Sequence, residues 1–101
     1  IVNAGVSIEN GRTQYNRYCA TCHGVRGDGQ GPVAGPNGPF AGVMPLIGTV
    51  RGLTDGHLYT TITLGSFGGN GRMPNYSRIP SEDRWDLVNY MRYLDSRGGQ
   101  P

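Results

Sequence analysis

The sequence predicts an all-α domain with long irregular loops. Apolar residues recur at helical spacing in the last quarter of the chain, and no segment alternates with the two-residue period of a strand. Glycine and proline are abundant, at 18 and 7 of the 101 residues, and many of them lie between the helical segments. The length fits one domain, residues 1–101, in which we expect residues 1–7 to form a loose terminus. Only 36% of the residues are hydrophobic, so this thin core needs a staple such as a disulfide, a metal or a large cofactor.

The first helix is expected from Ser7 or Ile8 to Tyr18. Ser7 is the candidate N-cap, because its hydroxyl can accept a hydrogen bond from a backbone N–H of the first turn. Gly11 lies inside this helix and costs it roughly 1 kcal/mol relative to alanine, so we expect a close packing contact there. Residues 24–45 follow with neither helical nor strand periodicity. Such a long loop in a compact domain is usually functional or disordered, and its apolar members favour a loop wrapped around something.

Two further helices are expected. Thr54 or Asp55 can cap a helix that runs through Leu64 and is closed by Gly65. The last helix is expected over residues 81–97, with acidic residues in its first turn, where they suit the positive end of the helix dipole. Its apolar stripe, expected to lie in the core, consists of Leu87, Val88, Met91 and Leu94, widened by Trp85 and Tyr90.

One short motif carries the chemistry. Cys19-Ala20-Thr21-Cys22-His23 is the C-x-x-C-H attachment signature of c-type haem. Cys19 and Cys22 lie one helical turn apart, so both thiols can face one edge of a porphyrin, and His23 is then directed at the iron. We therefore expect one haem c, attached covalently through both cysteines, with His23 as an axial ligand. The alternatives are a thioredoxin-like thiol pair, a zinc site and a plain disulfide. The first needs a strand–helix–strand context that is absent here, adjacent Cys22 and His23 are poorly placed to chelate zinc together, and a disulfide would close only a very small loop.

The second axial ligand has four candidates. Met91 lies on the apolar stripe of the last helix, where a core role is expected. His57 lies near the start of a helix, where an exposed histidine is ordinary, and Met44 follows the motif too closely for the intervening loop to pass the haem edge with ease. Met73 follows a glycine-rich loop and precedes Pro74, so this segment can lie extended across the haem face. Met73 is the expected ligand.

The chain resembles the class I, mitochondrial-type cytochromes c over nearly its whole length. Gly11, Tyr15 and Cys19 reproduce the amino-terminal pattern of that family, in which the glycine lets the first and last helices cross closely. Leu87-Val88-Asn89-Tyr90 is similar to the pattern of the last helix, and Met73-Pro74 is similar to the distal-ligand segment. The resemblance implies a small fold of three to five helices, with long loops wrapped around one covalently bound haem.

The loop after the motif extends this resemblance. Residues 27–32 are similar to the family's loop at the same place, and the resemblance implies that the Pro32 carbonyl accepts a hydrogen bond from His23 Nδ1. Among relatives, the chain is most similar to the mono-haem subunits of bacterial respiratory complexes, including alternative complex III. It departs from the mitochondrial members in having no lysine, so the lysine ring with which they dock is absent.

These observations predict a one-electron carrier or electron-transfer subunit of a respiratory chain, which is not itself an enzyme. His23 and Met73 would close both axial positions, so that no small-molecule substrate could bind the iron. The alternative is a haem enzyme or gas-binding sensor with an open distal side. The formal net charge of +2 is too small to indicate nucleic-acid binding, and no apolar run reaches the length of a membrane helix.

Partners and location follow from the resemblance. We expect redox proteins as partners, either a membrane respiratory complex or a terminal oxidase, and a periplasmic position or one on the outer face of the cytoplasmic membrane. Association with the membrane would occur only through such a partner or through an anchor that preceded Ile1. The residues proposed for an apolar docking patch are Val25, Val33 and Phe40, and those proposed to pair with haem propionates are Arg51, Tyr59 and Arg72.

Overall fold

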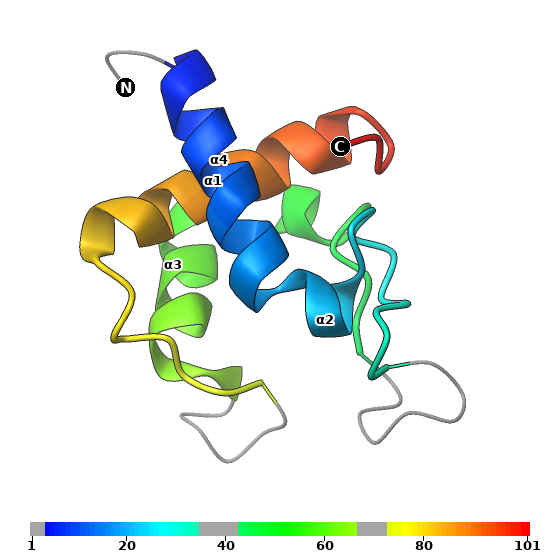
Figure 1. The fold of residues 1–101 in the computed structure, drawn as a ribbon, viewed down its shortest axis with the longest axis horizontal. Helices are drawn as coiled ribbons and strands as arrows, with labels where there is room; N and C mark the ends of the chain where they lie inside the picture. Colours follow the sequence, from blue (N-terminus) through cyan, green and yellow to red (C-terminus); the bar gives the residue numbers. More distant parts are fainter. Residues whose placement is uncertain (1–3, 35–42, 67–72) are drawn as a thin grey trace.

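The structure is a computed structural model that describes residues 4–34, 43–66 and 73–101. Within these ranges all regular secondary structure is helical. The helices are α1 (Ala4–Tyr18), α2 (Ala20–His23), the short 3-10 helix η1 (Val50–Gly52), α3 (Asp55–Leu64) and α4 (Ser81–Ser96). Helix α1 crosses α4, and α3 packs on α4 as well (Figure 1). The all-α class is confirmed.

Helix α1 begins at Ala4, earlier than predicted. Ser7 lies within the helix, three residues after its start, and its side chain is buried, so its predicted role as the N-cap is wrong. Its hydroxyl donates to Asp86 Oδ1 at 2.5 Å and accepts from Asn89 Nδ2 at 2.9 Å. These contacts with α4 hold the first turn of α1 in place, which is why residues 4–7 are not a loose terminus; residues 1–3 lie outside the described ranges.

Helices α1 and α4 cross at Gly11, as the sequence predicts. A Cβ atom at Gly11 would collide with the Asp86 carbonyl oxygen and would lie 2.6 Å from Tyr90 Cβ. Beside this crossing, Asn10 Nδ2 donates to Asp83 Oδ1 and to Asp86 Oδ2, both at 2.8 Å. The two backbones therefore meet where one helix has no side chain, and the polar side chains of both helices pair alongside.

Helices α3 and α4 have the predicted ends. The Thr54 hydroxyl accepts the His57 N–H at 3.0 Å and caps α3, which closes at Gly65 with φ +80°. Leu58 and Ile62 lie on one face of α3 and are buried. The buried residues of α4 are Leu87, Val88, Tyr90, Met91 and Leu94, all of which belong to the predicted stripe. They form the core together with residues of α1, α3 and η1.

Trp85 does not lie in the core, contrary to the prediction. Its side chain is 43% exposed and stacks on Tyr59 of α3, with the ring centroids 4.0 Å apart and the planes 18° from parallel. The Arg84 guanidinium lies 5.0 Å from the centroid of the same Tyr59 ring. Trp85 lies at the edge of the apolar stripe, and at this position it stacks on the Tyr59 ring of α3 near the surface and does not enter the core.

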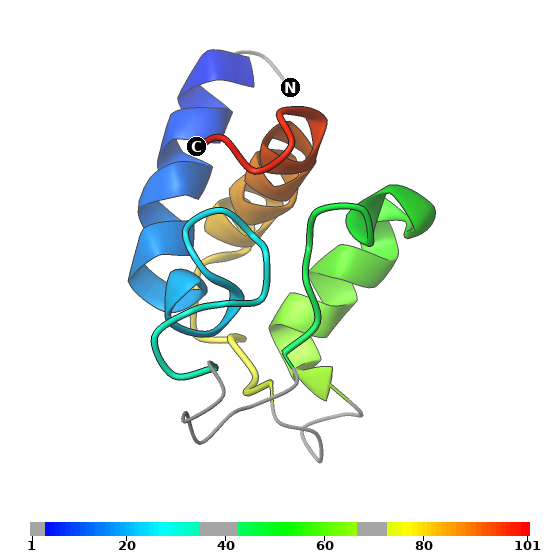
Figure 2. The ribbon, with the colours of Figure 1, turned by 90° about the vertical axis from the view of Figure 1, so that its right-hand side faces the viewer.

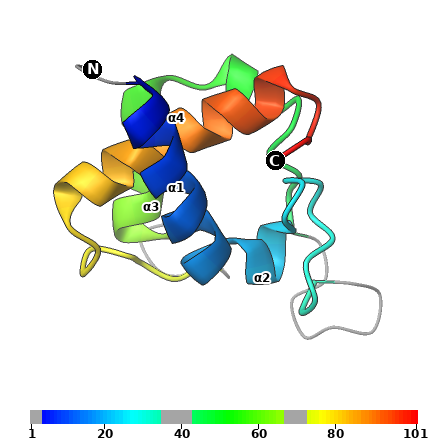
Figure 3. The same cartoon turned by 45° about the horizontal axis from the view of Figure 1, so that its top comes forward.

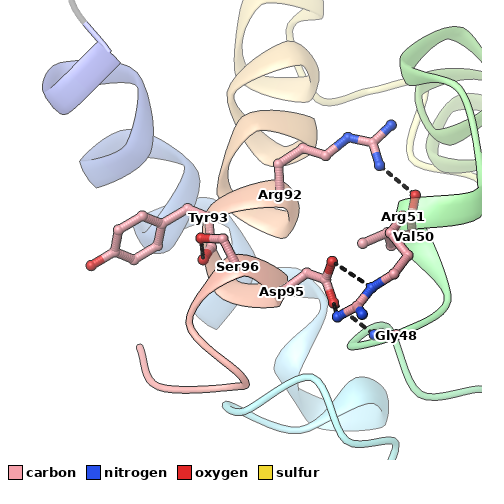
Figure 4. A network of polar contacts seen from close by, with 7 residues as sticks. All are labelled: Gly48, Val50, Arg51, Arg92, Tyr93, Asp95 and Ser96. Atoms are coloured by element: carbon pink, nitrogen blue, oxygen red, sulfur yellow. Dashed lines mark hydrogen bonds and ion pairs between the residues drawn. The ribbon is translucent and has the colours of Figure 1, made fainter.

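The C-terminal half of α4 holds the segment that leads into α3. Arg92 donates to the carbonyl oxygens of Val50 and, at 2.6 Å, of Leu53, and it forms an ion pair with Asp55 at 2.8 Å. One turn further, Asp95 accepts from the Gly48 N–H (Figure 4). These bonds give partners to the Leu53 carbonyl and the Gly48 N–H, and they add a second donor to the Val50 carbonyl, which also accepts the Leu53 N–H.

The segments that surround the C-x-x-C-H motif gather at one end of the molecule. Helix α2 and residues 24–34 lie on one side and α3 on the other, while residues 73–80 run between them beneath α4 (Figure 2). The C-terminal turn lies beside residues 46–50 (Figure 3). None of the helices in the described ranges is long and apolar enough to cross a membrane.

Replacing Gly11 with alanine should destabilise the fold by about 3 kcal/mol, because the new methyl group forces the two helices apart. Urea denaturation would measure this change. The control is Gly56→Ala in α3, where nothing lies within 4 Å of the added Cβ. That variant should be neutral or more stable by up to roughly 1 kcal/mol. Equal stabilities of the two variants would contradict a packing role for Gly11.

Candidate functional site

The C-x-x-C-H motif forms the helical turn that the sequence predicts. The Cys19 N–H donates to the Tyr15 carbonyl at 2.8 Å, so the motif continues directly from α1. The Cys19 carbonyl accepts the N–H groups of Cys22 at 3.2 Å and His23 at 2.9 Å. Both cysteines are free and half-buried. The two thiols thus lie one helical turn apart beside a histidine, as attachment of a haem requires.

The Cys19 thiol does not resemble the reactive thiol of a redox-active pair. Burial, and secondarily the charge of Cys22, raises the pKa of Cys19 to about 12. Reactive cysteines in thiol–disulfide chemistry have lowered pKa values instead. The described part of the chain also contains no group of three or more His, Cys, Asp or Glu side chains that could hold a metal ion. The thioredoxin-like and zinc alternatives therefore find no support there.

His23 is prepared to act as a neutral nitrogen ligand. Burial lowers the pKa of its imidazole, and a hydrogen bond with the Met44 carbonyl partly offsets that effect. Its Nδ1 atom lies 3.2 Å from the Met44 carbonyl oxygen. Since a carbonyl can only accept, Nδ1 carries the proton in this hydrogen bond. The lone pair of Nε2 is then available to a metal, which is the arrangement that haem iron needs.

The acceptor for His23 is Met44 and not Pro32, which corrects the prediction. The Gly31 N–H donates to the Cys22 carbonyl at 3.0 Å and the Val33 N–H donates to the Thr21 carbonyl at 3.2 Å, so Pro32 is held against the backbone of α2. The returning segment brings Met44 to the ring instead. Sequence reasoning considered only the thioether of Met44, and a backbone carbonyl leaves no trace in a sequence. Pro32 as a cofactor-binding residue stays a prediction.

The return of the chain to His23 depends on Gly27. Its carbonyl accepts the N–H groups of both Leu46 at 2.7 Å and Ile47 at 3.1 Å. Gly27 has a φ of +70°, which favours glycine at this turn. These two bonds fix residues 46–47 beside the loop that follows the motif, and so place the Met44 carbonyl within reach of the imidazole.

Met73 lies on a segment that is hydrogen-bonded both to the C-terminal end of α3 and to the residue before the motif. Its N–H donates to Ser66 Oγ and its carbonyl accepts the Ser66 N–H, both at 3.2 Å. Three residues later, the Tyr76 N–H donates to the Ile62 carbonyl at 2.9 Å, and the Tyr76 hydroxyl donates to the Tyr18 carbonyl at 3.2 Å. Tyr18 directly precedes the first cysteine, so this segment spans the same end of the molecule as the motif.

The other candidates for a second ligand lie elsewhere. Met91 is buried in the core on α4, and His57 is exposed at the start of α3. The Met44 side chain is 63% exposed, although its carbonyl faces His23. Met73 is half-buried and packs against the core. Of the four candidates it is the one that combines partial burial with a segment anchored next to the motif.

Arg51 and Tyr59, proposed to pair with haem propionates, both contact other side chains, whereas Val25 and Val33, proposed for docking, lie after the motif. Arg51 pairs with Asp95, and Tyr59 is occupied by its stack with Trp85. Val25 is 57% exposed directly after the motif, and Val33 is half-buried. Phe40 and Arg72 lie outside the described residues.

Tyr15 ties α1 to the end of the motif. Its side chain is fully buried, and its hydroxyl donates to the Gly24 carbonyl at 2.6 Å. Its ring packs on Tyr90 of α4, with the centroids 5.3 Å apart. Burial, and secondarily the charge of Cys19, raises the pKa of Tyr15 well above its usual range. Because α1, α2 and α4 all meet at this ring, Tyr15 helps to fix the orientation of the motif.

Stability should fall as the pH rises above about 10, because Tyr15 ionises in the unfolded chain while it stays protonated in the folded one. In Tyr15→Phe this contribution is absent, so the decline with pH should be shallower. At neutral pH the variant should lose about 1 kcal/mol with the hydrogen bond from the Tyr15 hydroxyl to the Gly24 carbonyl, which still accepts the Gly27 N–H. Urea denaturation between pH 7 and 11 measures both effects. An equally steep decline in the variant would exclude Tyr15 as the source.

Comparison with known families agrees with this geometry. Residues 6–91 match the family described as cytochrome C oxidase, cbb3-type, subunit III, a span that includes the whole motif and Met73. Comparison with curated proteins found no match to the chain. The matched region covers most of the domain, and it contains the C-x-x-C-H motif and the helices that position it. The chain therefore belongs to this family and is a class I mono-haem c-type cytochrome.

Proposed function

We propose that the chain is a one-electron carrier or electron-transfer subunit of a respiratory chain. One haem c is attached through Cys19 and Cys22, with His23 and Met73 as axial ligands. The observation that carries this proposal is the state of His23. It follows two free thiols one turn apart, and its Nδ1 proton is directed to the Met44 carbonyl, so Nε2 is left to bind iron.

When bound, the haem supplies an iron that alternates between the ferrous and ferric states. His23 would hold the iron on one side, and its hydrogen bond to the Met44 carbonyl keeps the imidazole ring in one orientation. Met73 would fill the other position, where a thioether favours the ferrous state. With both positions filled by the chain itself, neither oxygen nor a substrate has a site on the iron, and electron transfer is the activity that remains.

The surface beside the motif supports contact with another redox protein. Val25 and the Met44 side chain are both more than half exposed and apolar, and both lie next to the haem-attachment segment. Small contacts of this kind suit short-lived electron-transfer complexes. We propose a membrane respiratory complex or terminal oxidase as the partner, and a location in the periplasm or on the outer face of the cytoplasmic membrane.

The visible spectrum of the purified ferric protein tests the ligand pair. A weak far-red band from sulfur to iron is expected, because a methionine is proposed on the iron. A haem spectrum without this band would contradict methionine ligation and would favour the alternative of an open distal side, as in a haem enzyme or gas sensor. A colourless protein, expressed where haem attachment operates, would overturn the proposed function.

Met73→Ala should abolish the far-red band, lower the reduction potential on the order of 0.1 V and open the iron to carbon monoxide. The shift is a small part of the about 0.8 V over which axial ligands tune haem potentials. Met44→Leu is the matched control, since it removes an exposed thioether and keeps the backbone carbonyl that faces His23. Loss of the band in Met44→Leu but not in Met73→Ala would assign the ligand to Met44.

A further inference from the structure

Asp95 connects the C-terminal turn of α4 to the segment that leads away from the motif. Its Oδ1 atom accepts hydrogen bonds from the Gly48 N–H at 2.6 Å and from the guanidinium nitrogen Nη2 of Arg51 at 3.0 Å. Its Oδ2 atom accepts a hydrogen bond from Arg51 Nε at 3.3 Å (Figure 4). The carboxylate side chain is only 11% exposed, whereas that of Arg51 is 67% exposed. The bond from Gly48 is charge-assisted and is the shorter of the two on Oδ1, whereas the bond from Arg51 depends on a long, exposed side chain.

Gly48 stands next to the residues that place the Met44 carbonyl. The Gly27 carbonyl accepts the N–H groups of Leu46 and Ile47, as described above, and Asp95 on α4 accepts the Gly48 N–H. The segment therefore has one anchor in the loop after the motif and a second anchor on α4.

Pro45 transmits this position to Met44. The ring of Pro45 fixes its own φ, and a residue that precedes proline is restricted to extended conformations. Few backbone rotations are therefore free between the Met44 carbonyl and the anchored residues 46–48. A displacement of residues 46–48 must then displace the Met44 carbonyl, which lies 3.2 Å from His23 Nδ1.

We propose that Asp95 is a positioning residue for His23, acting through its hydrogen bond to Gly48 and the backbone of residues 44–48. This inference rests on the proposed function, because its consequence is felt at a haem ligand. A well-placed acceptor makes an imidazole a stronger donor to ferric iron. Loosening the Gly48 anchor should weaken that hydrogen bond and raise the reduction potential.

The charge of Asp95 must be separated from its geometry. The groups that face it are Gly48 and Arg51, with Arg92 on its own helix. Asp95→Asn removes the charge and keeps an oxygen that can accept the Gly48 N–H. Asp95→Ala removes both. Asp55→Asn removes a carboxylate that also pairs with α4, through Arg92, but does not contact residues 44–48, so it serves as the charge control.

The experiment measures two properties of each haem-loaded variant: the reduction potential, and the rate at which the His23 Nδ1 proton exchanges with D2O, followed by NMR of the ferrous protein. Asp95→Ala should raise the potential more than Asp95→Asn does and should speed proton exchange several-fold. Asp95→Asn and Asp55→Asn should show wild-type exchange. If Asp95→Ala does not fold, Asp95→Glu takes its place, because the longer carboxylate displaces the Gly48 anchor and keeps the negative charge.

Equal potentials and exchange rates in Asp95→Ala and Asp95→Asn would overturn the proposal, because the charge alone would then account for the effect. Wild-type values of both properties in Asp95→Glu, where Asp95→Ala is unfolded, would overturn it as well. Failure of the proposed function is recognised separately in the wild-type protein, which would then lack either a haem spectrum or its far-red band.

Discussion

The crossing of α1 and α4 at Gly11 is the contact on which the rest of the structure depends. A backbone carbonyl of α4 occupies the space that a side chain at this position would need. The close approach lets Ser7 and Asn10 reach the carboxylates of α4, and it brings the Tyr15 ring onto Tyr90. Because α2 continues directly from α1, the angle of this crossing also decides where the C-x-x-C-H motif points.

The site is built from segments that are far apart in the sequence. Cys22 and His23 belong to α2, Cys19 directly precedes that helix, and the acceptor that orients the histidine is a carbonyl of the returning loop. The Met73 segment is held at Ser66 and Ile62 on one side and at Tyr18 on the other. Backbone hydrogen bonds make most of these connections. A chain with a small core can in this way hold a site through main-chain contacts, while a large apolar cofactor would supply the missing interior.

Local patterns were enough to predict most of the helices. The Thr54 cap, Gly65 and the apolar stripe of α4 all act within one or two turns, and each is confirmed. Ser7 and Trp85 were misplaced for a common reason. A serine before a helix and an aromatic residue at the edge of a stripe have local preferences, which contacts with a second helix override: Ser7 bonds to α4, and Trp85 stacks on α3.

The sequence by itself determined the fold class, the haem-attachment motif and the family, because spacing along one helical turn sets the two thiols and the histidine in a fixed relation. Only the tertiary structure decided which carbonyl faces His23. That choice depends on where the chain returns after a long loop, and hence on the bonds that Gly27 and Asp95 make to residues 46–48. Hydrogen bonds to backbone groups depend on position in space and scarcely on residue type, so the sequence carries no sign of them.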